Sequence, residues 1–336
     1  MLKKITSFSV IVALATALAA CGGGGGADSS AGTPAGGSSN GGSGSGSASV
    51  SLGTSISSAS YSGVEGELYL QANQLRQSDG WGTFKQDVAL DTSAGLHAQY
   101  LINNFTVNDQ LVGVTGDAAH IEVAGQPGYV GAYPDQRNVK AGYQGVSLGE
   151  IEVNGPTLVG YDTDAVIAQK FIAGWLMSPG HRAGLLDPST TEAGIGVKAE
   201  ANSYISSTNG LEWRYQVAVM EMGHSATVTL PSGWVHTYPS DGAVAPGLVD
   251  THGNAFAPSI TIAPGRYFTT QSWTMTDASG AAVAGSQASY GLSNWAFFQP
   301  AGTTLTAGTT YTVTFSGTDD VGTTYTKIWS FTTPAS

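Results

Sequence analysis

The chain of 336 residues contains one cysteine, Cys21, and only 11% charged residues. With one cysteine, no disulfide can form within the chain, and neither a cysteine-based metal site nor a thiol nucleophile can lie in the domains that follow it. The folded part must therefore be stabilised by burial of apolar side chains. Lys and Arg total 12 against 24 Asp and Glu, and no basic cluster occurs after residue 4. This distribution argues against nucleic acid as a partner and against electrostatic binding to anionic lipid.

The first 20 residues have the pattern of an export signal. Lys3 and Lys4 precede an apolar run over residues 8–18 that is too short for a comfortable membrane span. Residues 18–21, Leu-Ala-Ala-Cys, resemble the lipobox of bacterial lipoproteins, which implies cleavage before Cys21 and its acylation. Gly22 at the next position implies the outer membrane of a Gram-negative envelope, with the protein periplasmic or surface-exposed. The alternative is an ordinary secretion signal with an incidental cysteine.

Residues 21–58 are mostly Gly, Ser and Ala and carry almost no apolar bulk. Such a segment cannot bury enough surface to offset its chain entropy, so we predict a disordered, flexible tether. The length of the remainder favours two domains, which we place at residues 59–225 and 232–336.

The stretch over residues 175–197, WLMSPGHRAGLLDPSTTEAGIGV, is the densest in interpretable features. Ser178 and Pro179 predict a helix start, because Ser caps a free backbone N–H and Pro has none to lose. His181 then lies in the first turn, where the helix dipole favours a neutral imidazole. An Asp-Pro pair ends the helix, and residues 193–197 predict a short strand. Elsewhere, the spacing predicts helices over 67–76, 90–103 and 164–177 and a strand over 212–222.

This stretch resembles the bacterial form of the CAP family (cysteine-rich secretory proteins, antigen 5 and pathogenesis-related 1; also called SCP domains). The family pattern is a Trp, a Ser-Pro-Gly-His-Arg, an apolar pair, a Glu and a Gly-x-Gly, which fall here at Trp175, residues 178–182, 185–186, Glu192 and 194–196. The resemblance extends over most of residues 61–223 and is weakest over 106–117. It implies an α+β fold class, with a three-layer α-β-α sandwich in the first domain.

The predicted second domain, residues 232–336, has a different residue pattern, in which short alternating runs rich in Thr replace the helical spacing. Residues 309–315 read TTYTVTF, in which aromatic and Val side chains alternate with Thr, and residues 328–333 repeat this alternation. Half-buried antiparallel strands have this pattern, and a β-sandwich is the economical outcome. The order of the motifs resembles the bacterial Ig-like domains that often follow CAP domains, so the expected second fold is an all-β Ig-like sandwich.

The resemblance also names a candidate site. In the CAP family two His and two Glu line a central cleft, and the His pair can hold a divalent metal such as Zn²⁺. By resemblance His120 and His181 take the His positions and Glu150 the first Glu, whereas the second Glu position holds Ser178. A zinc site made from this set would be weak or open. The alternative of equal weight is that His120 and His181 hydrogen-bond across the cleft and order its loops.

Other ionisable residues have simpler interpretations. His97 lies on an apolar helical face, which predicts a satisfied core histidine. Glu122 and Glu152 would replace Glu150 if the alignment is shifted by a step, and otherwise are expected to be surface charges. Glu192 is expected to cap or to pair locally, for example with Arg182. We expect the remaining histidines to be exposed, namely His224, His236 and His252.

No sequence pattern of a hydrolase accompanies the site. There is no Gly-x-Ser-x-Gly and no His-Glu-x-x-His, and Ser178 as an N-cap is already engaged. We therefore expect a non-enzymatic protein that binds a lipid-like or small apolar ligand, or a cell-surface partner, through the CAP cleft. The first alternative is a metal-assisted hydrolase of peptide or cell wall that uses the His/Glu cleft. The second is a structural or adhesive surface protein that acts through the Ig-like domain.

Overall fold

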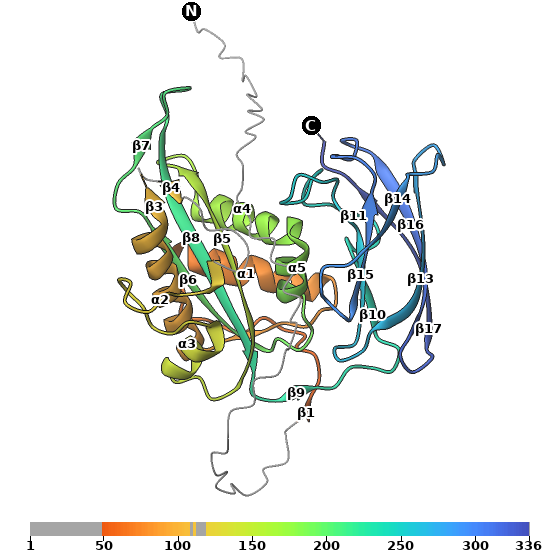
Figure 1. Cartoon of the computed structure of the whole chain (residues 1–336), viewed down its shortest axis with the longest axis horizontal. Coiled ribbons are helices and arrows are strands. Elements are labelled where there is room, and N and C mark those ends of the chain that lie inside the picture. Colours follow the sequence, from red (N-terminus) through yellow and green to blue (C-terminus); the bar gives the residue numbers. More distant parts are fainter. Residues whose placement is uncertain (1–48, 108–109, 112–118, 336) are drawn as a thin grey trace, which may run out of the picture.

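The computed structural model describes residues 49–107, 110–111 and 119–335. The export signal, Cys21 and most of the predicted tether lie outside these ranges. Figure 1 shows two bodies side by side, one with helices and strands in layers and one made of strands. Within the described ranges, no helix has the length and apolar character needed to cross a membrane.

The first body is built on a mixed sheet with the strand order β2-β6-β8-β5, and β7 adds to β8. The long strands β5 and β8 are antiparallel, as are β6 and β8. The bounds are β2 Lys85–Gln86, β5 Val146–Leu158, β6 Glu192–Ala199, β7 Tyr204–Ile205 and β8 Glu212–His224. A small hairpin joins β3 Thr106–Val107 to β4 Gln110–Leu111. The strands predicted over 193–197 and 212–222 are thus confirmed as parts of β6 and β8.

Helices cover both faces of this sheet. One face carries α2 (Val88–Phe105) and α3 (Pro134–Lys140), and the other carries α1 (Gly63–Ser78), α4 (Asp164–Met177) and α5 (Pro179–Leu185). All three helices predicted from spacing are confirmed, and α4 has the predicted bounds. Thr163 caps α4 by accepting from the backbone N–H of Val166. The result is the expected α-β-α layering.

Arg76 ties three parts of this body together. Its side chain is fully buried and donates to the backbone carbonyls of Gly82, Leu185 and Thr190 at 2.7, 2.6 and 3.0 Å. Burial of a guanidinium is tolerated where its donors are satisfied. This bond set fixes the end of α5 against α1.

The second body contains two four-stranded sheets with the orders β10-β12-β15-β14 and β11-β17-β16-β13. Aromatic side chains fill the space between them; Trp273 of β13, for example, stacks on Phe298 of β15. The bounds are β10 Val235–Tyr238, β11 Ala243–Val244, β12 Ser259–Ile262, β13 Phe268–Asp277, β14 Gly285–Ala288, β15 Trp295–Pro300, β16 Thr310–Asp319 and β17 Thr324–Thr332. We call this body the C-terminal sheet pair. Its assignment as Ig-like stays a prediction.

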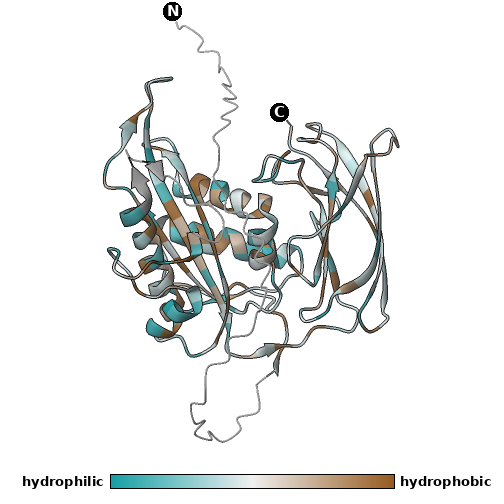
Figure 2. Cartoon of the chain, viewed as in Figure 1, coloured by the Kyte–Doolittle hydropathy of each residue, from teal (hydrophilic) through white to brown (hydrophobic). Residues whose placement is uncertain are grey.

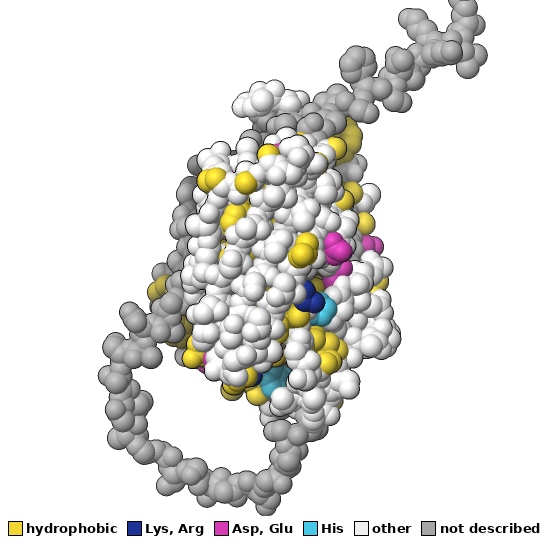
Figure 3. Space-filling view, turned by 90° about the vertical axis from the view of Figure 1, so that its right-hand side faces the viewer, with side chains coloured by type: hydrophobic (Ala, Val, Ile, Leu, Met, Phe, Trp, Pro, Cys, Tyr) yellow, Lys and Arg dark blue, Asp and Glu magenta, His cyan; other side chains and the backbone are white. Residues whose placement is uncertain are grey.

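Alternation along β16 and β17 has the predicted direction. Val313, Phe315 and Phe331 are fully buried, while the Thr and Ser residues between them lie on the outer face. Figure 3 views the molecule from this side and shows that few of the visible side chains are charged or apolar. In Figure 2 the hydrophobic segments lie along the strands and along the helices that cover them.

The tether ends earlier than the sequence suggested. Residues 49–58 pack on the folded part: β1 (Ser49–Val50) pairs with β9 (Thr227–Val228), Gly53 bridges to Thr83, and Ile56 contacts the core. Gly and Ser dominate the composition here, so the few apolar side chains, Val50, Leu52 and Ile56, were hidden in the pattern. The boundary predicted at residue 58 is therefore wrong by at least ten residues.

The two bodies share one continuous apolar cluster. Trp81 of the first body stacks on Trp295 of the second, with ring centroids 5.7 Å apart and planes at 6°. His236 lies against both Trp81 and Trp234, at 4.9 and 4.6 Å between centroids. The prediction that His236 is exposed is wrong, because it belongs to the joint between the bodies.

Candidate functional site

The candidate site lies on one face of the mixed sheet, where alternate residues of β5 and β8 are acidic. Glu150 and Glu152 of β5 and Glu221 of β8 point toward α2 and α3, and Glu150 is directly opposite Glu221 in register. The residues between them, such as Ile151 and Met220, face α4 and α5 and belong to the apolar core. Side chains of a strand alternate between its faces, so one pair of strands builds both a polar and an apolar layer.

The structure brings His120, Glu150 and His181 together. His120 lies in a short helical turn before the loop to α3, and its Nδ1 donates to Glu150 Oε1 at 2.8 Å. His181 reaches the same place from α5, with its ring centroid 6.0 Å from that of His120 and the planes at 80°. The two imidazoles are therefore neighbours in edge-to-face contact, and the hydrogen bond of His120 goes to Glu150.

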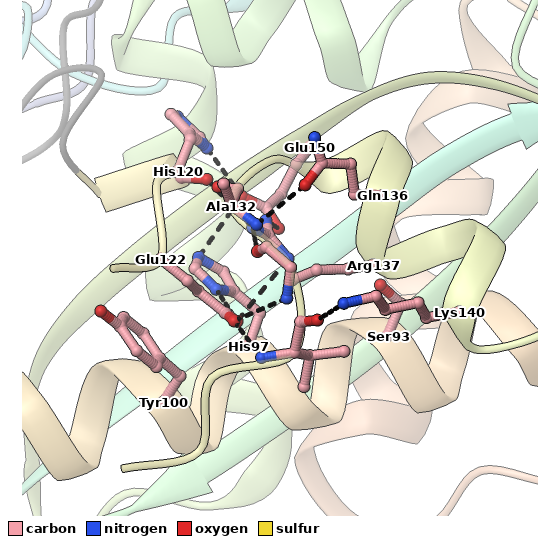
Figure 4. A network of polar contacts seen from close by, with 12 residues as sticks. Ser93, His97, Tyr100, His120, Glu122, Ala132, Gln136, Arg137, Lys140 and Glu150 are labelled. Atoms are coloured by element: carbon pink, nitrogen blue, oxygen red, sulfur yellow. Dashed lines mark hydrogen bonds and ion pairs between the residues drawn. The ribbon is translucent and has the colours of Figure 1, made fainter. Parts of the chain in front are cut away.

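A third histidine, His97, and an arginine, Arg137, extend the site into a buried polar network, part of which is shown in Figure 4. His97 of α2 contacts Glu122 Oε1 through Nδ1 at 3.0 Å and donates from Nε2 to the carbonyl of Ala119 at 2.8 Å. Arg137 of α3 donates to Glu150 Oε2 at 2.6 Å. His97 is thus a satisfied core histidine, as predicted.

Three of the carboxylates correct the sequence interpretation. Glu122 and Glu152 are buried, each with about 1% of its surface exposed, and so are not surface charges. Glu221 was not identified from the sequence; it accepts from Asn138 Nδ2 at 3.1 Å and contacts Ser93 Oγ at 3.3 Å. A signal for it existed, because the alternation Val217, Val219 continues to position 221 on the inward face.

The surroundings shift the pKa values of the two facing carboxyl groups, Glu150 and Glu221, in opposite directions. Burial pushes the pKa of Glu150 upward, but His97, Arg137 and His120 together outweigh it and hold this pKa well below its usual value. Burial and the charge of Glu150 raise the pKa of Glu221 well above its usual value. The pKa values of the two facing carboxyl groups are therefore shifted apart, and the negative charge is favoured on Glu150 over Glu221.

Two further groups in the cluster are strongly perturbed. Burial raises the pKa of Glu152 to about 7. Burial, with a smaller contribution from His120, lowers the pKa of His181 to about 3. The neutral imidazole predicted from the helix start is therefore present at neutral pH, but burial is its main cause. Neither ring nitrogen of His181 has a hydrogen-bond partner among the described residues.

The cluster is almost closed to solvent. The side chain of Glu150 is fully buried, and His181 is 4% exposed, while the side chain of His120 is 22% exposed. His120 is thus the member of this trio that faces solvent.

The described residues do not fit a zinc site. A catalytic zinc needs three protein ligands, and no group of three or more His, Cys, Asp or Glu with suitable geometry occurs in the described ranges. His120 and His181 supply two imidazoles, but both oxygens of Glu150 are engaged, one by His120 and the other by Arg137. A carboxylate held in this way orients its neighbours and is not available to a metal.

Nucleophilic catalysis also finds no support in the geometry. Ser178 occupies the N-cap of α5 and is fully buried, although its side chain makes no capping hydrogen bond.

Glu192 pairs with Lys85, Tyr143 and Ser225, so the predicted pairing with Arg182 is wrong. Arg182 points instead into the C-terminal sheet pair.

A pocket of about 250 Å³ lies next to the cluster, on the opposite side of β5. One wall comes from the start of β5 and from α5, and the other from Leu292, Asn294 and Trp295 of the C-terminal sheet pair. The first wall contains Leu148, Gly149, Glu150, Ile151, Gly180, Ala183, Gly184, Asp187 and Met222. Both bodies therefore contribute to this pocket.

Comparison with known proteins bears on the first body. No curated protein matches the chain. Among solved structures, CopC from Methylosinus trichosporium OB3b is similar at 15% identity over 30% of this chain and 89% of its own, with a TM-score of 0.23. PcoC, a methionine-rich copper resistance protein from Escherichia coli, is similar at 17% identity over 29% and 92%, with a TM-score of 0.23. Such low TM-scores carry no argument about this chain.

The family comparison is specific. Residues 71–217 match the model of the cysteine-rich secretory protein family, CAP. The matched range contains most of the sheet, His97, His120, Glu150 and His181, and the α-β-α layering agrees with it. The match supports a CAP domain in this part of the chain.

Proposed function

We propose that this protein is lipid-anchored in the bacterial cell envelope and that its CAP domain binds a small apolar, lipid-like ligand without catalysing a reaction. The observation that carries the proposal is the pocket of about 250 Å³ between β5, α5 and the C-terminal sheet pair. Drug-sized ligands occupy pockets of roughly 300–1,000 Å³. The pocket therefore suits a short alkyl or aryl group, such as one end of an amphiphile.

The chemistry of the lining supports an uncharged ligand group. Apolar side chains come from both walls, including Ile151, Met222 and Leu292. Three polar residues also line the pocket, namely Glu150, Asp187 and Asn294. The side chain of Glu150 is fully buried, and its oxygens are bonded by His120 and Arg137. Asp187 accepts from the backbone N–H of Ser189 at 2.7 Å, and burial raises its pKa.

The binding proposal is tested on the protein spanning residues 49–336 with 1-hexanol as the probe. We expect hexanol to shift the methyl NMR signals of Ile151, Met222 and Leu292, and to do so at lower concentration than hexanoate or hexylamine. Leu148→Ala should weaken the shifts, because Leu148 lines the pocket. Val146→Ala is the matched control on the same strand, since Val146 is exposed and outside the lining. Unchanged methyl signals at saturating hexanol would contradict the proposal.

The anchor has its own test. Replacement Cys21→Ser in the full chain should move the protein from the membrane fraction to the soluble fraction and abolish labelling by radioactive palmitate. Equal membrane association of both forms would contradict lipid anchoring, and no part of this outcome depends on the pocket.

Zinc titration separates the binding proposal from a metal-assisted hydrolase. We expect calorimetry of the 49–336 protein to show no stoichiometric zinc binding, because two imidazoles without a third ligand hold zinc weakly. The double variant His120→Ala/His181→Ala is the control for zinc bound elsewhere. Stoichiometric binding that the double variant loses would return the hydrolase to consideration.

A further inference from the structure

Arg182 is a buried cation that forms no ion pair with a carboxylate among the described residues, although Asp250 is close enough to act on its charge. It follows His181 on α5, and about 1% of its surface is exposed. Its guanidinium carbon lies 5.3, 5.0 and 5.4 Å from the ring centroids of Tyr238, Phe256 and Phe297. All three rings belong to the C-terminal sheet pair, so a cation of one body fills an aromatic cage of the other.

This environment differs from that of an ordinary buried arginine. Arg76 satisfies its donors with backbone carbonyls, whereas Nε and Nη1 of Arg182 have no hydrogen-bond partner within the described ranges. Burial of a guanidinium with two unsatisfied nitrogens costs free energy that a Leu or Met of similar size would not incur. Cation–π attraction to three rings offsets part of this cost only while the cage surrounds the cation. The contact therefore favours one arrangement of the two bodies over alternatives.

The same arrangement builds the pocket. On α5, Ala183 and Gly184 line its first wall directly after Arg182. On β15, Trp295 lines the second wall and stacks on Phe297 of the cage at 6.0 Å. Arg182 is thus adjacent in sequence to the pocket residue Ala183, and Phe297 of the cage is two residues from the pocket residue Trp295.

We propose that Arg182 is a positioning residue that fixes the C-terminal sheet pair against α5, so that Leu292, Asn294 and Trp295 form the second wall of the ligand pocket. The proposal rests on the proposed function for its consequence in binding, but the docking of the two bodies is measured separately. The C-terminal sheet pair is then part of the ligand site and is not an independent module.

The docking is measured by distances between spin labels. The 49–336 protein has no cysteine, so labels can be placed at Val139→Cys on α3 and Val321→Cys beyond β16, both of which are exposed. We expect a narrow distance distribution for the parent and a broad one for Arg182→Met, which keeps the bulk and removes the charge. Arg182→Lys should narrow the distribution again, because an ammonium also interacts with aromatic rings. Arg214→Met, on β8 away from the cage, is the control and should leave it narrow.

Binding is read on the same variants with 1-hexanol. Arg182→Met should lose the hexanol shifts of Leu292, and Arg182→Lys should recover them in part. If Arg182→Met fails to fold, Phe256→Leu weakens the cage from the other side and should broaden the distance distribution. A folded Arg182→Met or Phe256→Leu protein with the parent's narrow distribution would overturn the proposal, as would a Lys variant as broad as the Met variant. Absence of hexanol binding in the parent, with broadening intact, contradicts only the proposed function.

Discussion

The two faces of the mixed sheet are built from the same strands but bury different kinds of side chain. One face buries carboxyl groups, and the other buries apolar side chains. Toward α2 and α3, β5 and β8 present Glu150, Glu152 and Glu221. Partners from α3 hold Glu150 and Glu221, whereas Oε1 of Glu152 has no hydrogen-bond partner among the described residues. Toward α4 and α5, they present Ile151 and Met220, which need only close packing. On the first face stability depends on each partner being present and in the right protonation state. On the second it depends on volume.

The difference extends to the partner layers. The polar face is closed by α3 and the loop of His120, whose side chains are tied to Glu150. The apolar face continues through α5 into the C-terminal sheet pair as one cluster. The polar face therefore orients charges within the CAP domain, and the apolar face carries the joint and the pocket. Substitutions on the two faces should differ in size and in dependence on pH.

The largest effect is expected for Arg137→Met. It leaves the buried charge of Glu150 without its 2.6 Å partner, and loss of one member of a buried ion pair costs about 4 kcal/mol. Urea unfolding at neutral pH should show this loss, and the double variant Arg137→Met/Glu150→Gln should recover more than half of it. A single variant within about 1 kcal/mol of the parent would show that the network adds little to stability.

Ile151→Ala, on the apolar face next to Glu150, is the matched test. Ile151 is 2% exposed, and truncation of a buried Ile leaves a cavity that costs about 3 kcal/mol. This loss should be the same at pH 5 and pH 8, because no ionisable group is removed. A pH-dependent loss would show that the two faces are coupled through the strand.

Glu152→Gln should give a smaller change of opposite sign. The folded-state pKa of Glu152, about 7, exceeds its ordinary 4.5, so the folded state binds the proton more tightly than the unfolded state. The parent therefore loses stability as pH rises from about 4.5 through 7. At pH 8 the Gln variant, which is always neutral, should be more stable by up to about 3 kcal/mol, at 1.36 kcal/mol per pKa unit. Below pH 4.5 the two proteins should be equally stable, and a constant difference would contradict the argument.

The elements with local signals were predictable from the sequence. Helix α4 has long apolar periodicity and a Thr cap, and α5 has Ser178-Pro179 at its start, so both appear close to their predicted bounds. The trio of His120, Glu150 and His181 was found by the order of the CAP motifs. Its assembly in space follows from the fold that the order implies.

The features that could not be predicted from the sequence depend on residues that are distant along the chain. Glu122 and Glu152 look like surface charges locally, and only His97, 25 residues before Glu122, and the packing of α2 over the sheet show why they are buried. Arg182 and His236 meet the other body, so their burial depends on how the two bodies dock. No local pattern encodes that contact.

The smallest effect is expected for Ser93→Ala, which tests the edge of the polar network. Ser93 of α2 is fully buried, and its Oγ lies 3.3 Å from Glu221 Oε1, so its removal deletes one hydrogen bond, worth about 1 kcal/mol. Thr92→Ala is the neighbouring control; Thr92 is exposed and bonds only to the carbonyl of Val88 in its own helix, so the change should stay within about 0.5 kcal/mol. Thermal unfolding of both variants checks the difference. Equal stability would show that the hydrogen bond from Asn138 is sufficient for the Glu221 carboxyl group. The polar network would then end at β8, and α2 would be held on this face of the sheet by packing alone.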